Sequence, residues 1–277
     1  MHSKHLIKLG FAAILLTLID FVFDWLFGST TNLTYYGWKT VSNLLIILSL
    51  GYFILNSTIT GMLLCLTSCI IYFGVGYFNI LIEAYIYNIT SRSETINSMI
   101  RGLLLTLIIS PVLVQILGKW NKNEKEKQKV RKRSVFGWIW RILLGDLLYF
   151  VFAAIAGFTL YIVYPEFMEF YNDKMPPFIL IIKTNLLIRG FVFVGIAILI
   201  LRTIDLTLTK KAILIGLIFS ILGGIAPLIP PNELMPGYVR LAHGFEVGIS
   251  NFLYGVVLGY LLEQKYEKGT APNNVQM

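Results

Sequence analysis

Runs of apolar residues, each long enough to cross a lipid bilayer, recur along most of the chain. A helix rises about 1.5 Å per residue, so about 20 apolar residues cross the roughly 30 Å of hydrocarbon in a bilayer. The runs cover residues 6–27, 36–56, 59–82, 96–117, 135–164, 178–201, 212–228 and 239–262. They predict an all-α polytopic integral membrane protein with a bundle of about eight transmembrane helices, forming a single transmembrane domain over residues 1–277.

Composition agrees with this fold class. Hydrophobic residues make up 56% of the chain and charged residues 14%, whereas soluble domains carry about a quarter charged residues. The first run contains Asp20 and Asp24 and has no small-residue cleavage site, so we expect a retained helix and not a signal peptide. The fifth run is too long for one straight crossing, and its start, SVFGWIWRILLG, is expected to form an interfacial segment with Trp138 and Trp140 at headgroup level.

Charge in the loops predicts the orientation of the bundle. The stretch 119–134 holds eight Lys or Arg against two Glu, which is a net charge of +6. By the positive-inside rule this basic loop is cytoplasmic, and an even number of spans then places both termini in the cytoplasm. We expect a plasma membrane or bacterial inner membrane. The bilayer, with anionic lipids at the basic loop, is the expected partner, and nucleic acid is not, because the loop lacks aromatic residues beyond Trp120.

Ionisable residues inside the apolar runs are the main functional signal. A charge in the hydrocarbon costs at least about 2.5 kcal/mol, so it is normally paired or faces water. Arg189 lies near the middle of the sixth run. The predicted ligand-binding residues are Asp20, Lys183, Arg189, His243 and Glu246. Secondary candidates are Asp24, Glu83, Arg101, Asp146, Arg240, Ser250 and Asn251.

The last run and a short repeat add detail. On a helix, Arg240, His243, Ser250, Asn251 and Tyr254 fall within about 100° of one another, and this polar face is expected to look into the bundle. The stretches NSMIRG (97–102) and NLLIRG (185–190) share the pattern N-x-x-I-R-G. The pattern is consistent with an ancient duplication of a helical hairpin.

Three functions fit these residues. The first is a transporter or permease with an outward-facing polar cavity for a small anionic or zwitterionic solute, in which Asp20, His243 or Glu246 changes protonation. The second is a non-catalytic structural or regulatory subunit, in which Arg189 is locked to Asp20, Glu246 or Asp146. The third is an intramembrane enzyme acting on a lipid-linked substrate, with His243 and Glu246 as base and orienter and Ser250 as nucleophile.

The sequence favours a non-enzymatic role and assigns no catalytic residue. It contains no P-loop, dinucleotide fingerprint or metal-binding motif, so we expect no cofactor and no metal site. Cys65 and Cys69 lie one helical turn apart in an apolar run and are expected to be packing residues. Of the three histidines, only His243 lies inside a predicted span.

Overall fold

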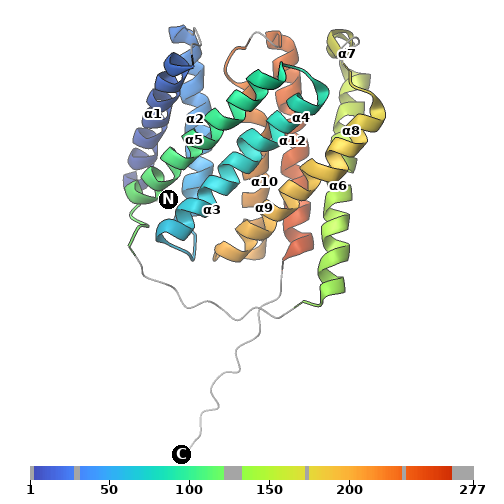
Figure 1. The fold of residues 1–277 in the computed structure, drawn as a ribbon. Helices are drawn as coiled ribbons and strands as arrows, with labels where there is room; N and C mark the ends of the chain where they lie inside the picture. The colour runs from blue at the N-terminus through green and yellow to red at the C-terminus, as the bar shows by residue number, and fades with distance from the viewer. Residues whose placement is uncertain (1–2, 28–31, 122–132, 172–174, 233–234, 264–277) are drawn as a thin grey trace, which may run out of the picture.

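The computed structural model describes residues 3–27, 32–121, 133–171, 175–232 and 235–263. In this part of the chain, eight antiparallel spans form a bundle (Figure 1). The first, second, fourth, fifth and eighth spans are α1 (Ser3–Leu26), α2 (Leu33–Leu55), α5 (Arg92–Ile116), α6 (Val135–Val163) and α12 (Gly237–Leu262). The third span is α3 (Gly61–Phe73), η1 (Gly74–Phe78) and α4 (Asn79–Tyr87). The sixth is α8 (Phe178–Thr184), η2 (Asn185–Arg189) and α9 (Gly190–Thr203). The seventh is α10 (Leu208–Ser220), η3 (Ile221–Ile225) and α11 (Ala226–Leu228). A short helix, α7 (Pro165–Tyr171), lies between the fifth and sixth spans.

The predicted all-α bundle is confirmed, with one correction at the fifth span. All eight helices are long and apolar enough to cross a membrane. The stretch expected to be an interfacial segment is instead the beginning of α6, which is one continuous helix of 29 residues. Ser134 caps this helix by accepting a hydrogen bond from the Gly137 amide at 3.1 Å. Arg133 and Arg202 lie over the ring of Trp138, and these contacts hold the first turns of α6 to the bundle.

We call the end of the bundle where α1 begins and α12 ends the lower end, as in Figure 1. Most of the basic loop, residues 122–132, lies outside the described residues.

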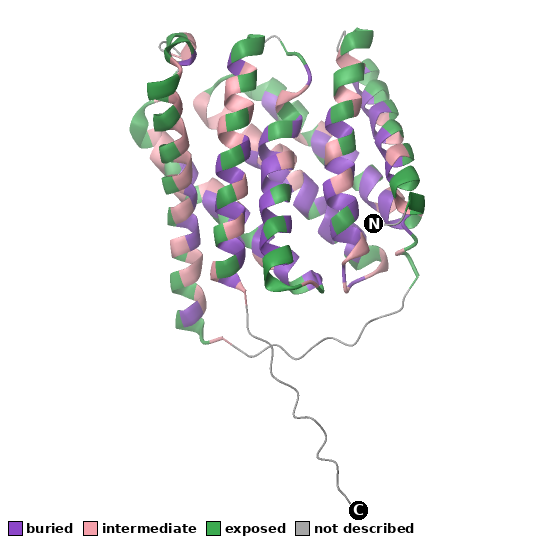
Figure 2. Ribbon diagram, turned by 180° about the vertical axis from the view of Figure 1, so that it is seen from behind, coloured by how far each residue is buried: buried purple, intermediate pink, exposed green. Residues whose placement is uncertain are grey.

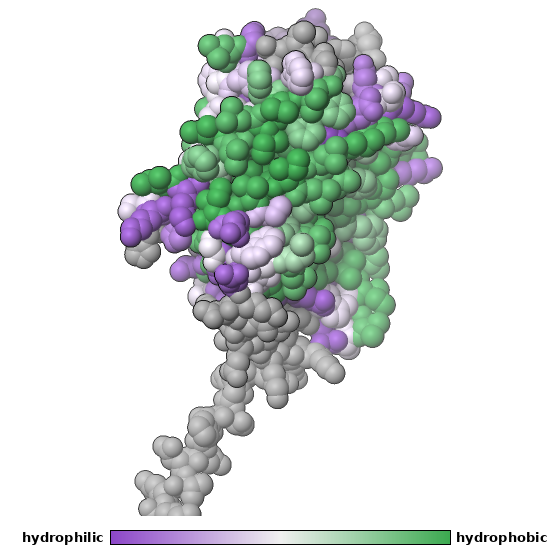
Figure 3. Space-filling view, turned by 60° about the vertical axis from the view of Figure 1, so that its left-hand side comes forward, coloured by the Kyte–Doolittle hydropathy of each residue, from purple (hydrophilic) through white to green (hydrophobic). Residues whose placement is uncertain are grey.

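Exposed large apolar side chains cover the flanks of the spans. In Figure 3 they form a broad band, and polar groups gather mainly at its edges. Such a band matches the hydrocarbon layer of a bilayer.

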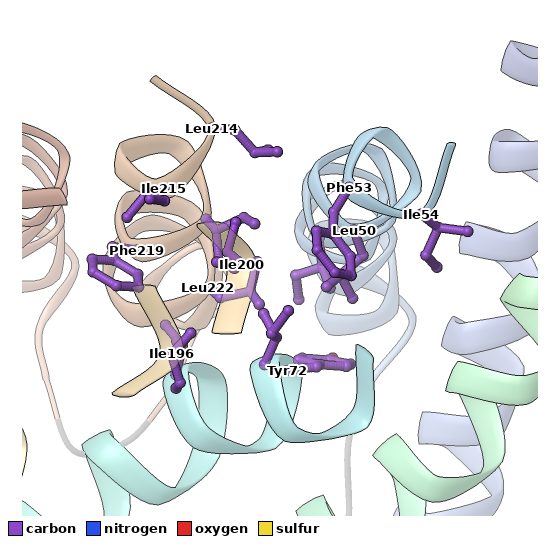
Figure 4. Packing of buried hydrophobic residues seen from close by; sticks show 14 of the residues in the cluster. Leu50, Phe53, Ile54, Tyr72, Ile196, Ile200, Leu214, Ile215, Phe219 and Leu222 are labelled. Atoms are coloured by element: carbon purple, nitrogen blue, oxygen red, sulfur yellow. The ribbon is translucent and has the colours of Figure 1, made fainter. Parts of the chain in front are cut away.

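Packing is tightest where small residues let backbones approach. In a membrane the hydrophobic effect does not drive helices together, so close van der Waals contact does. A Cβ added to Gly255 or Gly259 of α12 would come within 2.7 Å of the backbone of Gly216 or Ala212 of α10. Both pairs are four residues apart, which puts each pair on one face. Figure 4 shows the apolar core beside this contact, with Leu50, Phe53 and Tyr72 across from Ile200 and Leu222.

Three spans change from α- to π-helix partway across the bundle. The amide of Asn79 donates to the carbonyl of Gly74, Gly190 to Asn185, and Ala226 to Ile221, each five residues back. A π-turn inserts one extra residue into a helix and often marks a functional site. Arg189 is the last residue of η2. The structure therefore interrupts the regular helix at the deepest charged residue that the sequence singled out.

Backbone hydrogen bonds join separate loops at the lower end. The amide of Thr58 donates to the carbonyl of Thr203 at 2.8 Å, and Asp205 to Asn56 at 3.2 Å, around a bridge between Ser57 and Ile204. The amide of Gly61 donates to the carbonyl of Lys119 at 3.0 Å. Among the described residues of the upper loops, backbone bonds of this kind are all local. Backbone hydrogen bonds therefore join separate loops at the lower end, and none does so among the described residues of the upper loops.

Candidate functional site

The candidate residues fall into two separate groups instead of lining one cavity. The first group lies between α1, α2 and α5, and we call it the paired network. Its members are Thr17, Asp20, Asp24, Tyr36, Lys39, Asn43 and Arg101. The second group lies between α4, η2, α6 and α12, and we call it the Glu83–Arg189 site. Its members are Glu83, Tyr149, Asn185, Arg189, His243 and Glu246.

Both carboxylates of the paired network are buried, and both have cationic partners. Arg101 contacts Asp24 at 2.5 Å and Asp20 at 3.7 Å, and Lys39 contacts Asp20 at 3.5 Å. The side-chain amide of Asn43 donates to Asp20 at 2.9 Å, and the hydroxyl of Tyr36 donates to Asp24 at 3.0 Å. Two acids and two bases leave no net charge. Such a network satisfies the requirement that buried charges be paired and hydrogen-bonded.

The Glu83–Arg189 site has a deep cation and a shallow carboxylate. Glu83 lies four residues before the end of α4, about 6 Å below the upper end of its span at 1.5 Å per residue. Its side chain is 33% exposed, whereas that of Arg189 is 11% exposed, and the two meet at 2.5 Å. The guanidinium also lies over the ring of Tyr149, 5.4 Å from its centre. Its Nε is buried without a hydrogen-bond partner among the described residues.

The partner of Arg189 differs from every one that the sequence suggested. Asp20 belongs to the paired network, and Glu246 is hydrogen-bonded to His243. Asp146 contacts Gly190, whereas Arg189 pairs with Glu83. Glu83 is the partner of Arg189 because the arginine side chain extends from mid-depth toward the upper end, where a carboxylate keeps some contact with solvent.

His243 and Glu246 form a pair on α12 that faces the same region. Their side chains meet at 2.8 Å and are 30% and 15% exposed. The charges of Glu83 and Glu246 both act on Arg189 and on Tyr149. They also act on Tyr171 of α7: burial, reinforced by these two charges, raises the pKa of its hydroxyl to about 12. Tyr171 of α7 is therefore near enough to both carboxylates for their charges to act on it.

Packing above this site is loose. The last buried residue of α6 is Tyr149, fourteen residues before the end of that helix. Asn79 is the one buried residue of α4, and no residue of α12 between Arg240 and Val247 is buried. In Figure 2, α6 at the left edge is mostly intermediate or exposed, while the central helices carry most of the buried residues. The Glu83–Arg189 site therefore lies where the surrounding helices have few buried residues.

The remaining candidates lie apart from this site or support the helices. The side chain of Lys183 is exposed on α8, and Arg240 is half-buried in the first turn of α12. Asn251 is buried and donates to the carbonyls of Phe219 and Gly223 at 3.4 Å, next to η3. Ser250 is buried seven residues after His243, which separates their backbones by about 10 Å along the helix. A hydrogen bond between nucleophile and base is therefore not formed, and this removes the geometry on which the enzyme hypothesis depends.

One groove is hollowed into the flank of the bundle, but it is apolar. It has a volume of about 360 Å³ and lies between α3–η1 and α9. Its lining residues are Ile70, Phe73, Gly74, Phe78, Phe191, Val192, Gly195 and Ile196. It therefore differs in place and chemistry from the polar cavity expected from the sequence. Among the described residues no cluster of His, Cys, Asp and Glu is arranged to hold a metal ion.

Sequence reasoning missed three residues that complete these groups. Lys39 and Asn43 bind Asp20, and Tyr149 lies against Arg189. The sequence contains a signal for Lys39 and Asn43. They are polar residues four positions apart in an apolar span, so they lie on the same face of α2, and a buried acid such as Asp20 needs polar partners of this kind. Tyr149 follows Asp146 by three residues, but no pattern distinguishes it from the other aromatic residues.

The eight spans define a multi-pass α-helical membrane protein. Comparison of the chain with models of known families, with curated proteins and with solved structures found no match. Any more particular function must therefore be argued from the residues themselves.

Proposed function

We propose that the protein is a transporter that binds a small zwitterionic solute at the Glu83–Arg189 site. The observation that carries this proposal is Arg189 itself. It is a buried cation at mid-depth, it lies in a π-turn, and it is neutralised by a carboxylate that is one-third exposed. A solute entering from the upper end meets a separable ion pair instead of a closed one.

The charges of the site favour a zwitterion over a simple ion. Arg189 offers one positive group, and Glu83 and Glu246 offer two negative groups. A solute carboxylate bound to Arg189 displaces Glu83, whose charge is then available to a cationic group of the same solute. An anion alone leaves Glu83 without a partner, and a cation alone must approach Arg189. Buried charges left unpaired are costly, so both simple ions are disfavoured.

The positive-inside rule gives the direction of opening. The basic loop 119–134 connects α5 and α6 at the lower end, and the positive-inside rule supports a cytoplasmic position for that end and for both termini. The site then opens to the outside of a plasma or bacterial inner membrane. Anionic lipids are the expected partners of the basic loop.

The experiment is a thermal-unfolding panel on the purified protein in detergent. The probes are glycine betaine and neutral amino acids as zwitterions, acetate and succinate as anions, and choline as a cation. We expect a zwitterion to raise the unfolding temperature of the wild type and to have no effect on Glu83→Gln or Arg189→Met. Arg92→Met is the matched control, because Arg92 is exposed at the upper end and lies outside the site. Uptake of the stabilising solute into proteoliposomes then tests transport directly.

The panel also separates this proposal from a structural role. The paired network shows that this protein uses buried ion pairs to hold helices together, which supports a non-catalytic structural or regulatory subunit as the second candidate. A structural subunit gives no stabilisation by any probe. Equal stabilisation of the wild type and of both site variants, or stabilisation by anions alone, overturns the zwitterion proposal.

A further inference from the structure

Asp146 is a buried acid that neither group of charged residues uses. It lies on α6 with 6% of its surface exposed. Its Oδ1 has no hydrogen-bond partner among the described residues. The carboxyl packs onto the backbone of Gly190, so closely that a Cβ at residue 190 would overlap Oδ1. An acid at this depth without a cation is unusual, because an isolated buried charge neutralises itself.

The groups that face Asp146 do not supply a cation. On its own helix, Tyr149 lies one turn above it, with its ring against Arg189. From α12, Tyr254 comes near, but its hydroxyl donates to the carbonyl of Gly145 at 3.1 Å. From η2, the guanidinium of Arg189 is held by Glu83. Of these groups only Tyr254 is close enough for the charge of Asp146 to act on it, and no cation among the described residues acts on the carboxyl.

The space around the carboxyl admits a proton but not a metal ion. A bound cation such as Ca²⁺ needs six or more oxygen ligands at 2.3–2.6 Å, roughly, in an open arrangement. Here one side of the carboxyl is filled by the backbone of Gly190, and no further carboxylate is grouped with it among the described residues. A proton requires only one carboxylate oxygen.

We propose that Asp146 is a proton-binding site at mid-depth. A proton from the aqueous phase adds to one carboxylate oxygen and forms the neutral carboxylic acid, and the reverse step releases it. Proton binding at Asp146 stands apart from solute binding, whereas its use to drive solute movement rests on the proposed function.

The π-turn links this site to Arg189. Gly190 contacts Asp146, and Arg189 precedes Gly190 directly. The Nε of Arg189 and the Oδ1 of Asp146 are both buried and without hydrogen-bond partners. When a solute takes Glu83 away from Arg189, an ionised Asp146 is a buried acid that packs against the residue directly after the arginine. Loss of the proton and release of Glu83 therefore favour each other.

The test is infrared spectroscopy of the purified full-length protein. At neutral pH the wild type should show the C=O band of a protonated carboxyl, which shifts in D₂O and disappears reversibly as the pH is raised. Asp146→Asn should lack this band, and the control Glu246→Gln should retain it. Asparagine has nearly the shape of the protonated acid, so we expect Asp146→Asn to fold. A band of equal intensity in the wild type and in Asp146→Asn overturns the proposal.

A second measurement uses only the wild type. Dicyclohexylcarbodiimide adds to protonated carboxyls in apolar surroundings, and peptide mass spectrometry locates the adduct. We expect modification at Asp146 and none at Asp20 or Asp24, whose charges are paired. Absence of the adduct at Asp146, together with its presence at Asp20, overturns the proposal.

Failure of this proposal is distinct from failure of the proposed function. The infrared band and the adduct require no solute, so a null result in the zwitterion panel leaves them untouched. For a solute that does stabilise the protein, Asp146→Asn should retain exchange across proteoliposomes and lose accumulation driven by a pH gradient. Accumulation equal to that of the wild type shows that the solute moves without this proton and overturns the coupling.

Discussion

Arg101 and Arg189 occupy the same sequence pattern, N-x-x-I-R-G, yet their surroundings differ. Arg101 lies in a regular α-helix and contacts two buried carboxylates, which also have Lys39, Asn43 and Tyr36 as partners. Arg189 ends a π-turn, contacts one carboxylate that is one-third exposed, and leaves its Nε without a hydrogen-bond partner among the described residues. The glycine that follows each arginine also differs in its contact: Gly102 packs against the ring of Tyr77, and Gly190 against Asp146.

The difference shows that a charge inside a membrane can either hold helices together or remain available to a ligand. Where every donor and acceptor has a partner inside the protein, a ligand has nothing to gain by entering. Where a pair is exposed on one side and incomplete on the other, a ligand can replace one partner. Depth alone does not distinguish the two cases, because both arginines lie well inside their spans.

The largest expected effect is at Arg101. Arg101→Met leaves two buried carboxylates with only Lys39, and breaking a buried pair typically costs about 3–5 kcal/mol. We expect a large loss of folded yield and unfolding temperature. Adding Asp24→Asn should recover much of that loss, because it removes the charge that Arg101 neutralised. Arg92→Met, at the exposed start of the same helix, is the control, and an equal effect of both variants contradicts the assignment of a paired network.

A smaller loss of stability is expected at Gly190, which follows Arg189. Gly190→Ala introduces a methyl group where the carboxyl of Asp146 lies, and overpacking of this kind costs about 1–3 kcal/mol. Gly195→Ala is the matched control on the same helix, since nothing lies within 4 Å of a Cβ added there. Thermal unfolding of both variants measures the difference. Equal stability of the two would show that the close contact between α6 and α9 is absent in the membrane.

The pair between Glu83 and Arg189 should be weaker than that of the paired network. A double-mutant cycle of Glu83→Gln and Arg189→Met should give a coupling energy of about 1 kcal/mol, because Glu83 is partly exposed. The same cycle of Arg189→Met with Asp20→Asn should be additive, since Asp20 belongs to the other group. Denaturant or thermal unfolding supplies the free energies. If Arg189→Met were as harmful as Arg101→Met, the contrast between the two arginines would not hold.

The smallest effect is expected at His243. Its pair with Glu246 lies within one helix and is 30% exposed on the histidine side, so His243→Gln should change stability by about 0–1 kcal/mol. The comparison becomes sharper if the same variant alters solute affinity in the zwitterion panel. A loss of stability like that of Gly190→Ala would instead make His243 a packing residue.

The membrane fold was predictable, because apolar length and sparse charge are properties of local sequence. The inward face of α12 was predictable for the same reason: Ser250, Asn251 and Tyr254 are buried, and Phe245 and Ile249 are exposed. Helical periodicity needs no knowledge of neighbouring spans. The bounds of the third span were less predictable, since α4 continues to Tyr87 through three aromatic or charged residues.

The pairing of charges could not be read from the sequence. Counting residues gives the depth of an acid or a base but not the rotation of its helix about the bundle, so Glu83 could not be assigned to Arg189 instead of Arg101. The π-turns were also hidden, because GVGYF, NLLIR and ILGGI have no sequence pattern in common. One extra residue in a helix rotates the side chains that follow it about the helix axis. The two N-x-x-I-R-G stretches therefore differ in geometry although their sequences are similar.

The backbone bonds between lower loops have a mechanical consequence. Spans joined at the lower end, by Thr58 with Thr203 and by Gly61 with Lys119, pivot at that end when they tilt relative to one another. The displacement of a tilting span then grows with distance from the lower loops. The Glu83–Arg189 site lies toward the upper end, where a modest tilt gives the greatest change in the distance between spans.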